Sequence, residues 1–280
     1  KPSISEATRT KVLSLVDELG YRPNMVARSV KTNRTKAISV LVPTITNPAY
    51  PNVVHGIESS ARKEGYQVIL CCYAGDHISP IDIDCLSDLY DRMIDGMIIC
   101  GVPTMPSKRH DLRASATMAG FISRGTPFVF LSDPEQLDHF AKTFDIDLEK
   151  HAGLFHLLSV DRESAAFKAV TYLIKVGHKR IALVGDDTRD TYPHNIPFLR
   201  KLHGYKRALE TNAMSFDASL VAGASSEFEG GEQCVEHLLQ VGDAPTAIFC
   251  TGDSLALGVL RGERRLGVHV PAELAVVGFD

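Results

Sequence analysis

The chain has 280 residues, of which 44% are hydrophobic and 23% are charged, so it can bury a substantial core and divide into more than one lobe. This composition excludes disordered and collagen-like chains. The apolar runs are much shorter than the roughly 20 residues that span a bilayer, and no secretory signal follows the first residue. We therefore expect a cytoplasmic protein with no membrane partner.

The formal charge of −4 is divided unevenly along the chain. Residues 1–36 hold eight Lys or Arg and three Asp or Glu, a charge of +5, which leaves −9 for the remainder. A basic arm on an acidic body indicates a polyanion that binds at one end, although a solvated charged face would have the same composition.

Cysteine and histidine usage gives no sign of a metal or a disulfide framework. The six cysteines show no CxxC spacing, and the eleven histidines are scattered. Four cysteines lie inside apolar runs: Cys71, Cys72, Cys100 and Cys250. We expect buried, reduced thiols and no cofactor.

Two short helices are expected before residue 36. Ser5 starts a pattern with apolar residues at three- and four-residue spacing, and Gly20 ends it. A second helix is expected over residues 24–31, which is shorter than the roughly 12–15 residues that make an isolated helix marginal in water. It should therefore fold only against a partner, and residues 32–36 form a polar linker.

Beyond the linker, apolar runs recur at intervals of roughly 30 residues, the length of a βαβ unit. Strands are expected to start near Ala37, Gln67, Gly96, Pro127, Arg180, Ser219, Thr246 and Leu274. Helices are expected within 53–64, 165–176, 230–239 and 254–266, whereas 134–158 is interpreted as an insertion with its own helix. The predicted fold class is α/β, with two doubly wound parallel-sheet lobes at 37–159 and 160–280.

This fold class locates ligands before any motif is considered. Open parallel sheets bind ligands at the carboxyl ends of their strands, and two-lobed proteins bind them between the lobes. The segments at these positions are 44–50, 132–133, 186–189 and 252–253.

Catalytic signals are weak. No Gly-Lys dipeptide and no GxGxxG occur, which disfavours ATP hydrolysis and dinucleotide chemistry. The block 252–255, Gly-Asp-Ser-Leu, resembles the nucleophile motif of GDSL esterases, with Ser254 as nucleophile. It lies near the end of the chain and no Asp-x-x-His accompanies it, so we do not expect an enzyme. In the alternative interpretation Asp253 faces a ligand and Ser254 caps the next helix.

Several short motifs occur together in this chain: ISEATR at 4–9, ELGYRPN at 18–24, ARS at 27–29, GHKRIA at 177–182 and VVGFD at 276–280. This combination resembles the lactose- and galactose-repressor (LacI/GalR) family of bacterial transcription regulators. The resemblance implies periplasmic-binding-protein-like lobes, and a helix-turn-helix of roughly 20 residues before Ser5. On this basis residues 1–36 are the remnant of an all-α DNA-binding head plus a hinge helix, and the chain is expected to be truncated at both ends.

The resemblance also implies partners. The hinge helices of a homodimer would enter the minor groove of double-stranded, pseudo-palindromic operator DNA, with Val30 in place of the usual leucine wedge. The implied DNA-binding residues are Ser5, Thr8, Tyr21, Asn24, Ala27, Arg28 and Val30. The most suitable stacking residues for a ligand ring are Tyr50 and Tyr192, because the chain has no tryptophan.

A small-molecule effector, a sugar or a nucleoside or purine, would bind between the lobes and switch operator affinity. The implied effector-binding residues are Tyr50, Ser132, Asp161, Arg189, Lys201 and Asp253. Lys201 stands where many members have arginine, Ser132 where many have aspartate, and Gly252 where asparagine is usual. The alternative from another class is a periplasmic-type sugar-binding protein, which would need no basic head.

Overall fold

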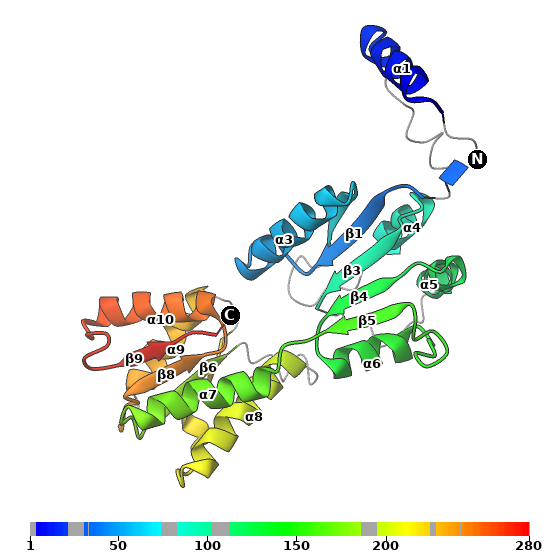
Figure 1. Ribbon diagram of the computed structural model, residues 1–280. Helices are drawn as coiled ribbons and strands as arrows, with labels where there is room; N and C mark the ends of the chain where they lie inside the picture. The colour runs from blue at the N-terminus through cyan, green and yellow to red at the C-terminus, as the bar shows by residue number, and fades with distance from the viewer. Residues whose placement is uncertain are drawn as a thin grey trace.

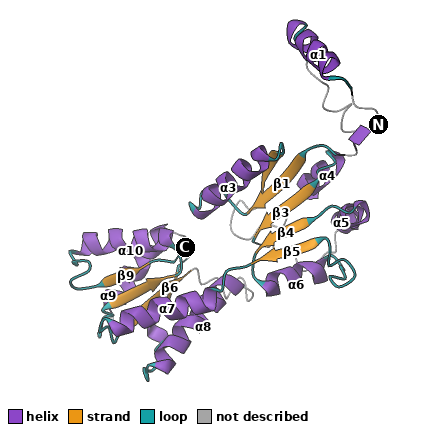
Figure 2. Ribbon diagram, viewed as in Figure 1, coloured by secondary structure: helices purple, strands orange, loops and turns teal. Residues whose placement is uncertain are grey.

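The computed structural model describes residues 4–21, 31–32, 34–73, 83–101, 112–185, 195–224, 228–240 and 242–279. Strands and helices alternate along these residues and form two parallel sheets, which confirms the predicted α/β class (Figures 1 and 2). In the described residues no helix is both long enough and apolar enough to cross a membrane.

Helix α1, Glu6–Glu18, confirms the first predicted helix. The Ser5 hydroxyl caps it by accepting a hydrogen bond from the Thr8 backbone N–H, and Gly20 follows with a φ of +58°. None of its residues is buried, and Val12 and Leu15 expose 52% and 44% of their surface. Figure 1 shows α1 standing apart from both sheets, so nothing in the described chain covers its apolar face. The helix expected over 24–31 falls outside the described residues except for Lys31.

The first sheet has five parallel strands in the order β2-β1-β3-β4-β5. They are β1 Ala37–Val42, β2 Gln67–Cys72, β3 Gly96–Cys100, β4 Phe128–Leu131 and β5 Phe155–Leu158. Alternation along β1 places Leu41 in the larger apolar cluster, with α4 Ile83–Asp91, α5 Leu112–Arg124 and α6 Pro134–Thr143. Val40 and Val42 face the other way and pack under α3 Ala49–Lys63.

The interpretation of residues 134–158 as an insertion is wrong. The predicted helix is present as α6, but the segment then supplies β5, which pairs in parallel with β4 and forms one edge of the sheet. Phe155 stacks on Phe128 with ring centroids 5.0 Å apart, so the segment belongs to the lobe's core.

The second sheet has four parallel strands in the order β7-β6-β8-β9. They are β6 Ile181–Gly185, β7 Val221–Gly223, β8 Ala247–Cys250 and β9 Ala275–Val277. Helices α9 Phe228–Gln240 and α10 Asp253–Leu266 cover one face, and α7 Arg162–Lys175 and α8 Ile196–Thr211 cover the other. The strand expected near Ser219 begins two residues later, because 218–220 form a short 3₁₀ helix that the Asp217 carboxylate caps.

The first sheet lies within 37–159 and the second within 160–280, the ranges predicted for the two lobes. The segment before β1 is attached to the first lobe by Asp95, whose carboxylate accepts hydrogen bonds from the backbone N–H groups of Thr35 and Lys36, at 2.9 and 3.2 Å.

All six cysteines carry free thiols, as expected. Cys100, Cys234 and Cys250 are buried, and Cys71 and Cys85 are half-buried. Cys72 is exposed, because it lies on an edge strand, so the expectation of burial is wrong for this residue.

Candidate functional site

The predicted ligand residues that the structure describes lie near the carboxyl ends of the strands. Two ion pairs join the lobes at these ends. Arg162, the first residue of α7, donates to both carboxylate oxygens of Asp133 at 3.0 Å. Arg200 of α8 pairs with Glu135 of α6. In Figure 1 the strands of the first sheet point toward the second lobe, so the segments after β4 and β8 lie on the facing sides of the lobes.

Tyr50 follows β1, as predicted, and lies near a second tyrosine. Its ring is half-buried against Val42 and Cys100. Tyr73, after β2, donates its hydroxyl to the Cys100 carbonyl at 2.8 Å, and burial raises its pKa. Gly101, with a φ of +72°, leaves room for both hydroxyls, since a Cβ there would lie 3.1 Å from that of Tyr73 and 4.0 Å from that of Tyr50. Sequence reasoning missed Tyr73, although it stands directly after a predicted strand.

Ser132 and Asp133 directly follow β4 and are both buried. The Asp133 carboxylate is held by Arg162, and its backbone N–H donates to the Gln136 side chain at the start of α6. Among the described residues, the Ser132 hydroxyl donates only to the Asp133 carbonyl, at 3.4 Å. Of these two side chains, Ser132 therefore makes the weaker contacts with the rest of the protein.

Asp161 lies where the chain passes into the second lobe, and it is exposed. Its carboxylate accepts the Ser164 backbone N–H at 3.0 Å and so caps α7. This hydrogen bond holds the pKa of Asp161 below its ordinary value. Asp161 therefore has a structural contact at the start of α7 in addition to its exposed position between the lobes.

Lys201 is a buried residue of α8 that reaches the carboxyl end of β8. Its ammonium donates to the Thr251 carbonyl and lies 4.3 Å from the centroid of the Phe279 ring. The cation thus lies between the residues that follow β8 and β9.

Asp253 is exposed and is the first residue of α10. Gly278, after β9, packs against its carboxylate so closely that a Cβ there would collide with Oδ1. The interpretation of Ser254 as the cap is wrong, because the N-cap is Gly252 and Ser254 lies inside the first turn.

The predicted residues of the DNA-binding head are described only in part. Ser5 and Thr8 are exposed, and their hydroxyls are 2.8 Å apart in the cap of α1. Tyr21 is exposed just after α1. The other predicted positions lie outside the described residues: Asn24, Ala27, Arg28 and Val30 in the head, and Arg189 and Tyr192 after β6.

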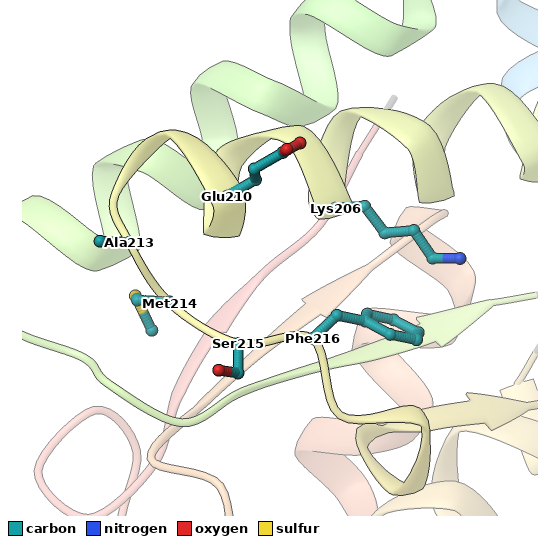
Figure 3. Close-up of a pocket in the computed structure, with 6 residues that line it drawn as sticks. All are labelled: Lys206, Glu210, Ala213, Met214, Ser215 and Phe216. Carbon is teal, nitrogen blue, oxygen red and sulfur yellow. The ribbon is translucent and has the colours of Figure 1, made fainter.

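An open hollow of about 460 Å³ lies elsewhere, at the C-terminal end of α8 (Figure 3). Lys206 and Phe216 line it, and the ammonium lies 4.4 Å from the ring centroid. The chain leaves this hollow toward the start of β7, so the hollow is at the amino-end edge of the sheet, away from Asp253 and Lys201. Among the described residues no group of three His, Cys, Asp or Glu side chains could hold a metal ion.

Comparison with known proteins gives the same fold and a class of function. Residues 170–280 match the model of the periplasmic binding protein-like domain. A LacI family transcriptional regulator from Enterococcus faecium, solved with bound ribose, is 27% identical, with a TM-score of 0.64 over 87% of this chain and 77% of that one.

Two curated relatives match almost the whole chain, residues 1–36 included. Catabolite control protein A from Priestia megaterium is 30% identical over 279 residues, which is 100% of this chain and 75% of that protein. The HTH-type transcriptional repressor CytR of Escherichia coli (strain K12) is 31% identical over 280 residues, covering 99% of this chain and 72% of that protein. The chain therefore belongs to the LacI family of transcriptional regulators.

Proposed function

We propose that this protein is a repressor whose affinity for operator DNA is switched by a small molecule bound at the facing carboxyl ends of the two sheets. The observation that carries the proposal is Asp253, an exposed carboxylate at a helix N-terminus on this edge, where the buried Lys201 ammonium also donates a hydrogen bond to the Thr251 carbonyl after β8. The proposed effector site comprises Tyr50, Ser132, Asp161, Arg189, Lys201 and Asp253.

The proposed effector is a polyhydroxylated molecule, either a sugar or a nucleoside or purine. A carboxylate accepts several hydrogen bonds and donates none, which suits neighbouring hydroxyl groups. Lys201 provides the complementary donors, and Tyr50 provides an aromatic face for a ring. The related E. faecium regulator was solved with ribose, which makes ribose the first compound to test.

Calorimetry with ribose, other pentoses and hexoses, nucleosides and purines tests this site. Asp253→Asn should weaken binding of whichever compound binds by about tenfold or more, since it replaces two acceptor oxygens by one acceptor and a donor. Glu210→Gln, in the hollow at the opposite edge of the second sheet, is the matched control. Unchanged affinity in Asp253→Asn, or a loss confined to Glu210→Gln, would refute the proposed site.

For DNA, we propose a homodimer that places two basic N-terminal arms on a pseudo-palindromic duplex. Ser5, Thr8 and Tyr21 are exposed on or beside α1, as phosphate-contacting residues must be. Coupling of about 1–3 kcal/mol between effector and DNA would change operator affinity five- to 150-fold. A duplex selected from a random pool, titrated with and without the bound effector, measures this, and equal affinities would overturn the switch.

We propose that the protein acts as a regulator and not as an enzyme, in line with its relatives. A serine nucleophile needs a base in hydrogen-bonding contact. In the described part of the chain, the Ser254 hydroxyl has no histidine partner. Incubation with p-nitrophenyl esters should therefore give no turnover that Ser254→Ala abolishes.

A further inference from the structure

The start of helix α6, in the first lobe, is tied to two different helices of the second lobe. Asp133, directly before α6, pairs with Arg162 of α7. Glu135, in the first turn of α6, pairs with Arg200 of α8. A single point of attachment leaves two bodies free to rotate about it, whereas a second point stops that rotation. The two ion pairs together therefore fix how the second lobe is turned relative to the first.

The Asp133–Arg162 pair lies beside the place where the chain crosses between the lobes. The crossing runs from the end of β5 to the start of α7, and Arg162 is the first residue of α7 (Figure 1). One guanidinium nitrogen of Arg162 lies 3.0 Å from each carboxylate oxygen of Asp133, whose side chain is only 3% exposed. Breaking a buried pair leaves a charge without compensation, which is strongly unfavourable. This pair is therefore a stable pivot.

The Glu135–Arg200 pair is open to solvent. Its two side chains are 47% and 33% exposed. Exposed ion pairs are weak, and salt screens them. This second pair therefore forms and breaks at little cost while the pivot stays in place, so the second pair decides whether the lobes are free to turn.

Each of three residues in these ion pairs adjoins, in the chain, a residue of the proposed effector site. The neighbours are Ser132 beside Asp133, Asp161 beside Arg162, and Lys201 beside Arg200. Successive residues of a helix point about 100° apart. Arg200 accordingly contacts the first lobe, while Lys201 reaches the Thr251 carbonyl at the end of the second sheet. A ligand that contacts Lys201 therefore acts on the same turn of α8 that carries Arg200.

We propose that the Glu135–Arg200 ion pair is a salt-sensitive latch that regulates the effector site by holding the two lobes together across it. When the latch breaks, the second lobe turns about the Asp133–Arg162 pivot, and the two halves of the site separate. A ligand that contacts both lobes then binds more weakly, because the competent arrangement is less populated. The latch itself needs no ligand, whereas its regulatory role rests on the proposed function.

Small-angle X-ray scattering of the purified chain tests the latch without any ligand. Glu135→Gln should raise the population of the separated arrangement about two- to fivefold, and so increase the radius of gyration at low salt. Salt at about 1 M should produce the same increase in the wild type and should leave Glu135→Gln unchanged. Size-exclusion chromatography in line with the measurement separates monomers from dimers, so that a change in association is not mistaken for a separation of the lobes.

Glu163→Gln is the matched control. Glu163 pairs with Arg207 at 2.7 Å, and these side chains are 27% and 45% exposed, but both belong to the second lobe. Losing this pair should leave the radius of gyration unchanged.

An exchange of charges separates the ion pair from other effects of the substitutions. Glu135→Arg and Arg200→Glu should each behave like Glu135→Gln, and the double variant should recover the wild-type radius of gyration and its salt dependence. The arginine at the start of α6 remains in the double variant, so recovery cannot come from the helix terminus. Equal radii of wild type and Glu135→Gln at low salt, or a double variant that does not recover, would overturn the latch.

Calorimetry with ribose tests the regulatory role. Glu135→Gln should weaken ribose binding about two- to fivefold, whereas Glu163→Gln should not weaken it. Unchanged ribose affinity in Glu135→Gln, together with a larger radius of gyration, would refute the regulation and leave the latch in place. A wild type that does not bind ribose would count against the proposed effector, and the regulatory role would be lost with it, while the scattering result would still decide the latch.

Discussion

Replacing Glu263 by glutamine removes a carboxyl group that the folded protein buries without a partner. Glu263 lies on α10, is completely buried, and neither of its carboxylate oxygens has a hydrogen-bond partner among the described residues. Val259, one turn earlier, is buried in the cluster that packs α10 on α9 and β8. Burial raises the pKa of Glu263 from 4.5 to about 7, because the charged form loses its hydration.

The size and sign of the effect follow from this pKa. In the unfolded chain Glu263 ionises near its ordinary value, so between pH 4.5 and 7 the folded state binds more protons and stability falls as the pH rises. The difference in pKa corresponds to about 3 kcal/mol of lost stability above pH 7, and to less than about 1 kcal/mol at pH 5.

Urea unfolding at pH 5 and pH 8 measures the contribution of Glu263. The wild type should lose about 2 kcal/mol more stability than Glu263→Gln between these two values, and Glu263→Leu should be the most stable protein at pH 8. Other groups that titrate in this range are common to all three proteins, so the difference isolates Glu263. Glu64→Gln, at an exposed carboxylate, is the control. The same pH dependence in wild type and Glu263→Gln would refute the reasoning.

Two further changes test the packing and the contact between the lobes by urea unfolding. Gly204→Ala should destabilise the protein by about 3 kcal/mol, because its Cβ would collide with the Glu163 carbonyl where α8 crosses α7. Gly56→Ala, in an open position on α3, should instead stabilise it by about 0.5–1 kcal/mol. Similar effects at both sites would show that the collision is not the cause. Arg162→Met should lower the free energy of unfolding by about 3 kcal/mol, because it leaves the buried Asp133 carboxylate unpaired. Adding Asp133→Leu should recover part of that loss. If the losses of the two single variants simply add in the double variant, the pair is not coupled.

The spacing of the apolar runs along the sequence predicted the strands well where each run is long or strongly apolar. The starts near Ala37, Gln67 and Gly96 coincide with those of β1, β2 and β3. The strand β5 was missed because Phe155–Leu158 is a four-residue edge strand, of which only Phe155 is buried. Such a strand is defined by its pairing with β4, which the local sequence does not encode.

The candidate site was predictable in position but not in its contacts. The rule that ligands bind at the carboxyl ends of parallel strands selected Ser132 and Asp253 from their places in the chain, whereas Lys201 was selected by the family resemblance. It could not show that Arg162 occupies the Asp133 carboxylate or that Asp161 caps α7, because these contacts involve turns and helix starts whose geometry depends on the tertiary fold.

The attachment of Thr35 and Lys36 to Asp95 determines the length of free chain between α1 and the first lobe. A free chain reaches about 3.5 Å per residue, so fixing residues 35 and 36 removes about 7 Å of reach from the connection. A shorter connection has fewer conformations available to absorb a rotation of the first lobe before it reaches the residues that precede β1. The carboxylate of Asp95 thus fixes the last two residues before β1 to the first lobe, so these residues follow the sheet when the lobe rotates.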